Sequence, residues 1–244
     1  MPLISLETPY PAIVTGASRG VGRAIALALA ELGCPVVVNY VANADAAAET
    51  VARVEAIGAR AVAIRADVTN DADVHRLVDE SRRAFGQIGI LVNNAGVATR
   101  RDIFSNAIED FDAAFAANTR AAYLVTRLVL PDMREIGWGR LIFLSSTAAR
   151  TGGVISAPYA GSKAALEGLM RHYAAYAARH GITANAIAPA FIATDMIAGA
   201  ALPPNMPIQR YGAPEEVAMI AQTIVACGFM TGQTIQVNGG VYMT

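Results

Sequence analysis

Cysteine, lysine and histidine are all scarce in this chain. Its 244 residues include only two cysteines, Cys34 and Cys227, which are far apart and form no Cys-x-x-Cys or Cys/His pattern. We therefore expect both to be small buried side chains in a reducing compartment rather than a disulfide or a metal site. The three histidines have no metal-ligand spacing, so no metal is expected.

Charge and long apolar runs are scarce as well. Charged residues make up 16% of the chain and the formal net charge is -1, with no basic run. These features argue against binding to nucleic acid or to an anionic membrane. No apolar stretch approaches the roughly 20 residues that span a bilayer, and residues 1–11 lack the basic and apolar regions of a secretory signal. The sequence therefore predicts a cytoplasmic protein.

Apolar residues are abundant, at 54%, which is enough for a large core. Short β-branched runs alternate with longer alanine-rich helical stretches, a pattern typical of a parallel sheet covered on both faces. Right-handed crossovers then give an α/β fold, a doubly wound Rossmann fold in which residues 1–244 form a single domain. The seven predicted strands are Ala12–Thr15, Val36–Asn39, Ala61–Ala66, Ile90–Val92, Leu141–Ser145, Thr183–Ile187 and Thr234–Val237. Helices are predicted near 21–32, 44–57, 72–85, 108–116, 119–136, 159–180 and 214–227.

A glycine-rich turn follows the first predicted strand and leads directly into a helix. Glycine lets the backbone turn sharply and approach a pyrophosphate, whose charge then lies at a helix N-terminus. The spacing is Gly-x-x-x-Gly-x-Gly rather than the common Gly-x-Gly-x-x-Gly. The turn therefore predicts a dinucleotide site that includes Gly16, Ser18, Arg19, Gly20, Val21 and Gly22.

The end of the second predicted strand indicates which dinucleotide binds. A carboxylate at that position would bind the adenosine ribose and repel a 2′-phosphate. Here the strand ends in Asn39 and Tyr40, and Arg19 in the glycine turn offers a guanidinium for the phosphate. Asp45 and Glu49 lie in the next helix, where we expect a first-turn electrostatic role. The sequence thus favours NADP(H) over NAD(H).

Two further loops follow strands and so point to the same end of the sheet, where ligands bind in such folds. The first carries Asp67 and Val68, which we expect beside the adenine ring. The second is the Asn-Asn-Ala-Gly stretch, in which Asn94, Ala95 and Gly96 let the backbone lie beside the cofactor.

A serine, a tyrosine and a lysine form the predicted catalytic group. Ser146 follows the fifth strand, and Tyr159 and Lys163 are four residues apart, so on a helix they share one face. Reduction of a carbonyl needs a proton on the oxygen. A nearby ammonium is expected to lower the pKa of the tyrosine toward neutrality, while the serine stabilises the developing charge. Lys163 is the one lysine among 19 basic residues, which indicates a chemical requirement at this position.

Together these residues resemble the short-chain dehydrogenase/reductase family over nearly the whole chain. The matching motifs are TGASRGVG, Asp67-Val68, NNAG, Ser146 and Tyr159-x-x-x-Lys163. The resemblance implies a seven-stranded parallel Rossmann sheet, a homotetramer, and a fourth catalytic residue, Asn118, in a proton relay toward the lysine. It also implies that the segment after the sixth strand closes over the nicotinamide and contributes Pro189, Ile192 and Thr194. The family usually has Pro-Gly where this chain has Pro189-Ala190, so a shifted loop is expected.

Within the family the chain is most similar to bacterial 3-oxoacyl-[acyl-carrier-protein] reductases of fatty acid biosynthesis, through motifs such as VVVNY, FIATDM and the closing Val-Asn-Gly-Gly. That resemblance implies a small-molecule carbonyl substrate carried as an acyl carrier protein or CoA thioester. Two positions where those enzymes place docking arginines are Gly137 and His180 here, although Arg134, Arg140 and Arg179 lie close by in the sequence. The segment between Met196 and Pro207, expected to cover the substrate, is short.

Two alternatives remain open. One is an NADP-dependent reductase or dehydrogenase of free ketones, sugars or polyols. The other is a catalytically silent Rossmann protein that senses the redox state of NADP, which predicts loss of the serine, tyrosine or lysine.

Overall fold

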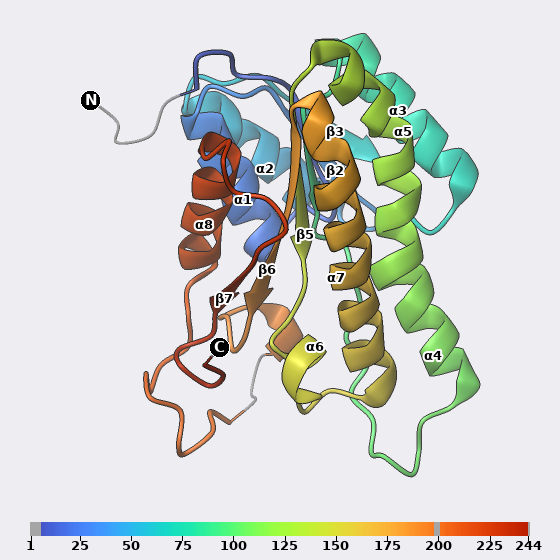
Figure 1. Ribbon diagram of the computed structural model, residues 1–244, viewed down its shortest axis with the longest axis vertical. Coiled ribbons are helices and arrows are strands. Elements are labelled where there is room, and N and C mark those ends of the chain that lie inside the picture. The colour runs from blue at the N-terminus through green and yellow to red at the C-terminus, as the bar shows by residue number, and fades with distance from the viewer. Residues whose placement is uncertain (1–5, 198–200, 244) are drawn as a thin grey trace.

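A computed structural model describes residues 6–197 and 201–243 of the chain. Its centre is a parallel sheet of seven strands in the order β3-β2-β1-β4-β5-β6-β7 (Figure 1), which confirms the predicted fold. The strands are β1 (Ala12–Val14), β2 (Val36–Tyr40), β3 (Ala61–Arg65), β4 (Ile90–Asn93), β5 (Gly139–Leu144), β6 (Ile182–Pro189) and β7 (Thr234–Val237).

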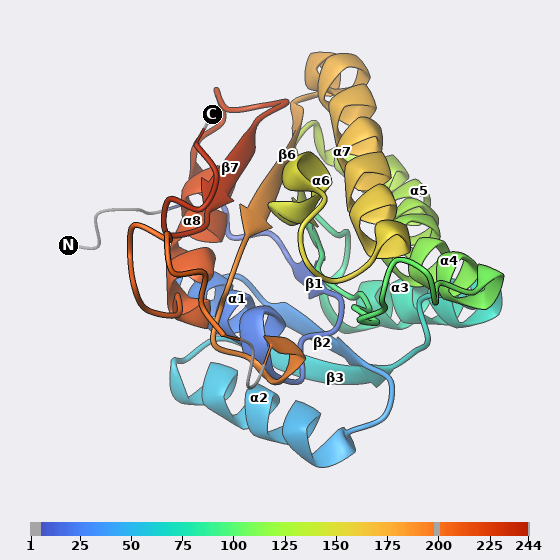
Figure 2. The same cartoon turned by 90° about the horizontal axis from the view of Figure 1, so that it is seen from below.

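Helices cover both faces of the sheet. In Figure 2, α1, α2 and α8 lie on one side, and α3, α4, α5 and α7 lie on the other. The helices are α1 (Gly20–Glu31), α2 (Ala44–Ala56), α3 (Asp71–Phe85), α4 (Ile108–Phe115), α5 (Ala121–Ile136), α6 (Ala148–Thr151), α7 (Ala157–Ala177) and α8 (Pro214–Ala226). A π-helix, η1 (Ala116–Arg120), and two 3-10 helices, η2 (Ala178–His180) and η3 (Asp195–Ile197), complete the described elements.

The two faces of the sheet explain why the strands read as continuous apolar runs. Alternate residues of a strand point to opposite faces. Val36 and Val38 accordingly pack into the core beneath α1, α2 and α8, whereas Val37 packs into the core beneath α3, α5 and α7. Each face of the sheet therefore needs its own apolar partners. The bounds of the predicted strands match those of the observed strands to within a few residues.

The helix boundaries differ from expectation at one functional place. The sequence predicted separate helices at 108–116 and 119–136, but α4, η1 and α5 run on without interruption through a π-helical turn. A π-helix accommodates an extra residue per turn and is common at functional sites, and this one contains Asn118. The short helices α6 and η3 were not predicted, because neither is long enough to show an apolar period.

The strand order reverses direction between β1 and β4, which pair with each other although β1 is followed by β2 in the chain. In doubly wound sheets, ligands bind at the carboxyl ends of the strands at this reversal. In Figure 1 those ends lie at the lower edge, with α6 and the segment after β6 beside them. Among the described residues, no helix is long and apolar enough to cross a membrane.

Candidate active site

The glycine-rich turn lies between β1 and α1. Gly16 and Gly20 have φ values of 64° and 57°, in the left-handed region that favours glycine. Gly22 has no room for a side chain, since a Cβ there would lie 2.5 Å from Asn94 Nδ2 and against the carbonyl oxygen of Gly16. The turn is therefore held in a conformation that other residues could not adopt.

The start of α1 suits an anion. Its N-cap residue, Arg19, makes no side-chain capping hydrogen bond, and no acidic residue occupies the first turn. The first backbone N–H groups of a helix lack partners within the helix, and the helix dipole favours negative charge there. The turn and helix together thus fit a dinucleotide pyrophosphate, as the glycine spacing predicted.

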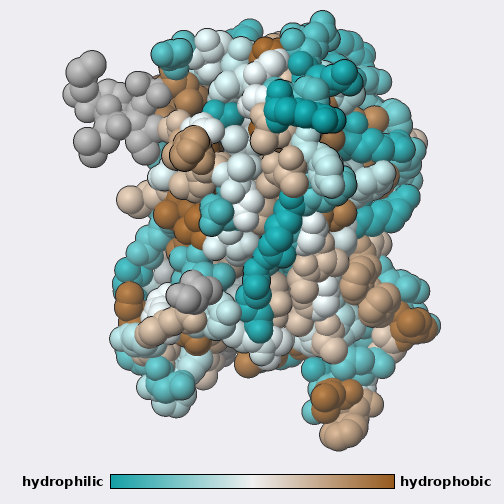
Figure 3. Space-filling model, viewed as in Figure 1, coloured by the Kyte–Doolittle hydropathy of each residue, from teal (hydrophilic) through white to brown (hydrophobic). Residues whose placement is uncertain are grey.

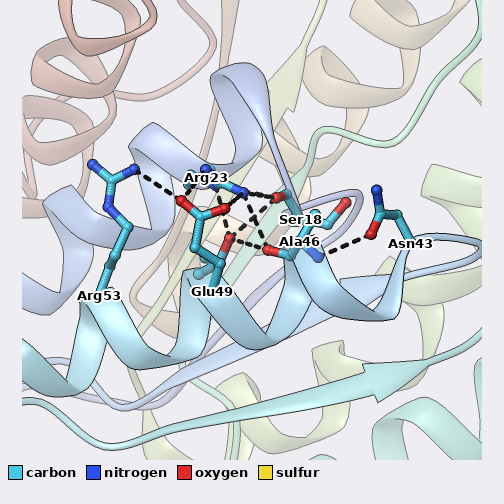
Figure 4. Close-up of polar contacts among 7 residues, drawn as sticks. Ser18, Arg23, Asn43, Ala46, Glu49 and Arg53 are labelled. Carbon is cyan, nitrogen blue, oxygen red and sulfur yellow. Dashed lines mark hydrogen bonds and ion pairs between the residues drawn. The ribbon is translucent and has the colours of Figure 1, made fainter.

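Arg23, which the sequence reasoning missed, holds the turn from behind (Figure 4). Its guanidinium donates to the Ser18 carbonyl at 2.7 and 3.1 Å, and its Nη1 pairs with Glu49 Oε1 of α2 at 2.9 Å. Thr50 Oγ1 donates to the same carbonyl at 3.1 Å. The first-turn role expected for Glu49 is therefore wrong: its carboxylate orients Arg23, whereas Asp45 does lie in the first turn of α2.

Polar side chains from neighbouring strands brace the turn from the other side. Asn39 is buried; its Oδ1 accepts from the Gly16 amide at 3.2 Å and its Nδ2 donates to the Ala66 carbonyl at 2.9 Å. Asn94 Nδ2 donates to the Thr15 and Gly16 carbonyls at 2.8 and 3.1 Å. The side-chain amides of both asparagines thus bind backbone groups. Asn39 is therefore not a free ligand for the cofactor; it matters because it is not a carboxylate.

Tyr40 and the loop after β3 stand at the edge of this region. Tyr40 is half-buried against the core, and its carbonyl accepts from the Ala66 amide at 2.9 Å. Asp67 Oδ1 accepts from the amide and hydroxyl of Thr69 at 2.9 and 2.8 Å, and the Val68 side chain is buried. The carboxylate therefore shapes its own loop, and contact of either residue with adenine stays a prediction.

The segment after β6 reaches back to the glycine turn. Arg19 Nη1 pairs with Asp195 Oδ2 at 2.9 Å, and both side chains are exposed. Thr194 lies over Gly20, where an added Cβ would be 3.3 Å from Thr194 Cγ2. The same guanidinium that was expected to bind a 2′-phosphate is therefore already positioned by an acidic partner across the site.

Backbone strain in this segment lies at Phe191. The described non-glycine residues with positive φ comprise Phe191 alone, at 52°, and not Ala190. Ile192 is buried in the core against Gly212, so only its backbone is free to contact a cofactor. Pro189 ends β6, and its carbonyl accepts from the Thr147 amide. Residues 198–200, part of the predicted substrate cover, lie outside the described residues.

Ser146, Tyr159 and Lys163 come together beyond the end of β5. The side chains of Ser146 and Tyr159 lie near each other, and Ser146 acts on the tyrosine as a hydrogen-bond partner. Lys163 Nζ lies 5.9 Å from the Tyr159 ring centroid and donates to the Leu144 carbonyl at 2.7 Å. The one lysine of the chain is thus buried beneath the tyrosine, at the carboxyl end of the sheet where a substrate would meet a cofactor.

The pKa values differ from the sequence expectation. Burial raises the pKa of Tyr159, and the hydrogen bond with Ser146 lowers it by less. Burial likewise lowers the pKa of Lys163 to about 8. The predicted lowering of the tyrosine pKa by the lysine is therefore wrong for the protein by itself, because loss of hydration is the largest influence on both groups and Lys163 does not offset it at Tyr159.

Asn118, in the π-helix, connects this site to the loop after β4. Its Oδ1 accepts from the Val97 amide at 2.8 Å, and its Nδ2 donates to the Val97 carbonyl at 3.1 Å and to Ser162 Oγ at 2.9 Å. Gly96 lies between Asn118 and Lys163: a Cβ on this glycine would be 2.6 Å from Asn118 Oδ1 and 3.4 Å from Lys163 Nζ. The side chain of Asn118 is fully engaged, so a part in proton transfer would fall to other atoms of this turn.

The comparisons with known proteins agree with this geometry. The family model for short chain dehydrogenases matches residues 11–202. The chain belongs to the short-chain dehydrogenase family. It is 40% identical to a 3-oxoacyl-[acyl-carrier-protein] reductase of Synechocystis sp., in an alignment covering 97% of this chain and 98% of that protein.

Other relatives act on different molecules. A hydroxynaphthalene reductase-like protein of Metarhizium brunneum is 37% identical, with 97% of this chain and 98% of that protein covered. A solved 7α-hydroxysteroid dehydrogenase, in complex with NADH and 7-oxo glycochenodeoxycholic acid, is 33% identical with a TM-score of 0.88, covering 95% of this chain and 93% of that chain. The protein is therefore an oxidoreductase acting on CH–OH or C=O groups with a nicotinamide dinucleotide, and these relatives leave its substrate open.

Proposed function

We propose that this short-chain dehydrogenase reduces a 3-oxoacyl thioester to the 3-hydroxyacyl product with NADPH. The observation that carries the proposal is the Ser146–Tyr159 pair over buried Lys163, at the carboxyl end of a sheet whose glycine turn fits a pyrophosphate. The similarity to the Synechocystis reductase supports the thioester as the substrate class.

The chemistry assigned to this chain is a proton transfer. Bound NADPH supplies the hydride that reaches the carbonyl carbon. Tyr159, a phenol that is protonated at neutral pH, donates its proton to the carbonyl oxygen, while Ser146 donates a hydrogen bond to the same oxygen as charge develops. Lys163 Nζ would bind the nicotinamide ribose and stabilise the phenolate left behind, and the π-helical turn at Asn118 would return a proton toward it.

The preference for NADPH rests on Arg19. Its guanidinium is the exposed cation of the glycine turn and is paired with the exposed Asp195, and β2 ends in Asn39 and Tyr40 without a carboxylate that would repel a 2′-phosphate. The remaining cofactor contacts proposed for the chain come from the turn, from Tyr40, Asp67 and Val68, from the Asn94–Gly96 stretch, and from Pro189, Ile192 and Thr194.

Replacing Arg19 tests that preference. We expect Arg19→Ala to weaken NADPH binding by roughly 10- to 100-fold, because it removes charge-assisted hydrogen bonds to the phosphate, and to change NADH binding little. Equilibrium titration of both nucleotides measures the two effects, and Arg83→Ala, at an exposed position of α3, is the matched control. If Arg19→Ala weakened the binding of NADPH and NADH equally, the proposed contact of Arg19 with the 2′-phosphate would be wrong.

We also propose a homotetramer. Apolar side chains gather at the lower right of Figure 3, over the start of α4 and the loop before it. Phe104 is 96% exposed and Ile108 is 67% exposed, which is costly for a chain that stays monomeric. Light scattering of the purified protein tests the assembly, and a monomer at micromolar concentration would contradict it.

A free ketone, sugar or polyol is the second candidate substrate. The observation in its favour is that the expected docking arginines are incomplete. Gly137 ends α5 with a φ of 72°, where a side chain would be strained, and Arg140 is buried with its Nε donating to the Val225 carbonyl at 2.9 Å. Arg140 is therefore excluded as a docking residue, which leaves Arg134 and Arg179 as the exposed candidates.

The experiment that separates these substrates is NADPH consumption by purified protein. Acetoacetyl-CoA, an acyl carrier protein thioester, free ketones and sugars are compared side by side, with NADH as the control cofactor. Fastest turnover of the thioesters supports the proposal. Turnover confined to free carbonyls keeps the mechanism and replaces the substrate class.

A further inference from the structure

A buried carboxylate lies directly behind the catalytic group and has no role in the chemistry above. Glu167 is 1% exposed and lies on α7 one turn beyond Lys163 and two turns beyond Tyr159. Residues at this spacing share one face of a helix. The face of α7 that carries the proton donor therefore continues into an acidic group that points into the protein.

Three donors from three segments satisfy this carboxylate. Ser145 Oγ, after β5, donates to Oε1 at 3.0 Å. Arg150 of α6 donates to Oε2 from Nε at 3.0 Å and pairs with it through Nη2 at 2.8 Å. Arg171, on α7 itself, donates to the same oxygen at 2.8 Å. Both oxygens of Glu167 are thus occupied.

Two of these donors bracket Ser146. Ser145 immediately precedes it, and Arg150 lies in the short helix that begins two residues after it. Ser146 Oγ in turn accepts from the Ala148 amide at 3.1 Å, inside the bracketed segment. Glu167 therefore ties residues 145–150, which carry the serine, to the helix that carries the tyrosine.

The strength of this connection follows from burial. A carboxylate that loses its hydration needs every hydrogen bond it makes, and bonds between charged groups are among the strongest in proteins. Arg171 connects α7 only to itself, whereas Ser145 and Arg150 connect it to another segment. Moving the serine segment away from α7 would leave a buried charge without two of its partners.

We propose that Glu167 is a positioning residue that fixes Ser146 Oγ beside the Tyr159 hydroxyl. This inference rests on the proposed roles of Ser146 and Tyr159. It predicts that Glu167 affects the chemical step far more than the binding of substrate, because a small displacement of a catalytic group is costly to the transition state.

The first test compares steady-state kinetics of four variants. Glu167→Gln keeps the shape but offers a donor where two guanidinium groups need an acceptor, so kcat should fall by roughly 10- to 100-fold with KM within about twofold. Arg150→Met should lower kcat several times more than Arg171→Met, although both arginines contact the same oxygen. Ser145→Ala should resemble Arg150→Met while Glu167 keeps both of its arginine partners, so it keeps the test open if Glu167→Gln fails to fold.

A second measurement needs no substrate. The phenolate absorbance of each variant is titrated against the same variant carrying Tyr159→Phe, so that the difference reports Tyr159 alone. Because the hydrogen bond with Ser146 lowers the pKa of Tyr159, we expect it to titrate at higher pH in Glu167→Gln, Ser145→Ala and Ser146→Ala, and unchanged in the surface control Glu80→Gln.

The two measurements separate failure of this inference from failure of the proposed function. If the wild type reduces no substrate but the titration shifts as expected, positioning holds and the reaction was assigned wrongly. If Tyr159 titrates at the wild-type pH in folded Glu167→Gln and Ser145→Ala, or if Arg150→Met and Arg171→Met are equally active, Glu167 has only a structural role.

Discussion

Lys163 shows at the level of one residue how function opposes stability. The chain uses arginine at its other 18 basic positions, yet it keeps a lysine where the group must be buried and compact. Burial lowers its pKa to about 8, which means that the folded protein holds the charged form at a cost. A residue chosen for packing alone would carry no charge here.

Replacing this lysine by an apolar residue of similar length should therefore stabilise the fold. At pH 7 we expect Lys163→Met to be more stable by roughly 2 kcal/mol: about 3 from removing the buried charge, less about 1 for the lost hydrogen bond to Leu144. Between pH 8 and 10.5 the unfolded wild type binds more protons than the folded one, so its penalty fades and the wild type becomes the more stable protein by about 1 kcal/mol. Urea unfolding across that range measures the difference; a constant gap would contradict burial of the charge.

Tyr159 is the proposed proton donor. We expect Tyr159→Phe to lower kcat by at least about 1,000-fold, within the range that general acid catalysis supplies, and to leave nucleotide affinity unchanged. Stopped-flow turnover and nucleotide titration measure the two properties. Tyr176→Phe is the matched control, since that tyrosine is exposed on the same helix. Turnover within a few-fold of the wild type would remove Tyr159 as the proton donor.

At the scale of elements, the β1–α1 connection depends on contacts that only glycine allows. Gly22 sits against Asn94 and Gly16, so a single methyl group would displace the turn. Asn94 and Asn39 fix the same turn from β4 and β2, and Arg23 fixes it from α1. The nucleotide site is thus a property of four elements together rather than of the motif alone.

This dependence predicts opposite effects for two helical glycines. Gly22→Ala should abolish nucleotide binding and destabilise the protein by a few kcal/mol, because the added carbon overlaps backbone. Gly168→Ala, on α7 where nothing lies within 4 Å of the new carbon, should be neutral or stabilising by up to about 1 kcal/mol. Thermal melts and nucleotide titration distinguish the two variants, and tight binding by Gly22→Ala would show that the turn adapts.

At the scale of the whole molecule, one buried carboxylate connects the helical layer to the sheet. Asp132 of α5 is buried and accepts from Arg82 of α3 at 3.1, 3.0 and 2.8 Å. It also accepts from the Ile88 amide at 3.1 Å, just before β4. A single side chain therefore holds two helices and the approach to a central strand together.

Removing this carboxylate should weaken the fold. We expect Asp132→Ala to cost roughly 3 to 5 kcal/mol, because the Arg82 guanidinium and the Ile88 amide lose a shared buried partner. By contrast, Glu216→Gln breaks an exposed pair with Arg210 and should have little effect. Chemical denaturation measures the free energy of unfolding of both variants. A loss for Asp132→Ala no larger than that for Glu216→Gln would mean that water replaces the carboxylate at Arg82 and the Ile88 amide.

The sequence by itself determined those features of this protein that follow from local residue patterns. Alternation of apolar runs predicted the sheet and its covering helices, because strand and helix periods are local properties. The glycine turn and the Tyr159–Lys163 spacing predicted the two groups of residues from which the proposed site is built, since both lie within one element or one turn. Even the one lysine was informative, because its chemistry stands out against the arginines around it.

Tertiary structure decided what those residues do to one another. Burial, which no local pattern measures, reversed the expected direction of the Tyr159 pKa and removed Arg140 from the surface. The bonds of Arg23 to Ser18 and of Glu167 to Arg150 join segments far apart in the sequence, where spacing carries no signal. Their geometry exists only after the sheet has brought its carboxyl ends together, because hydrogen bonds and desolvation depend on distances in the folded chain.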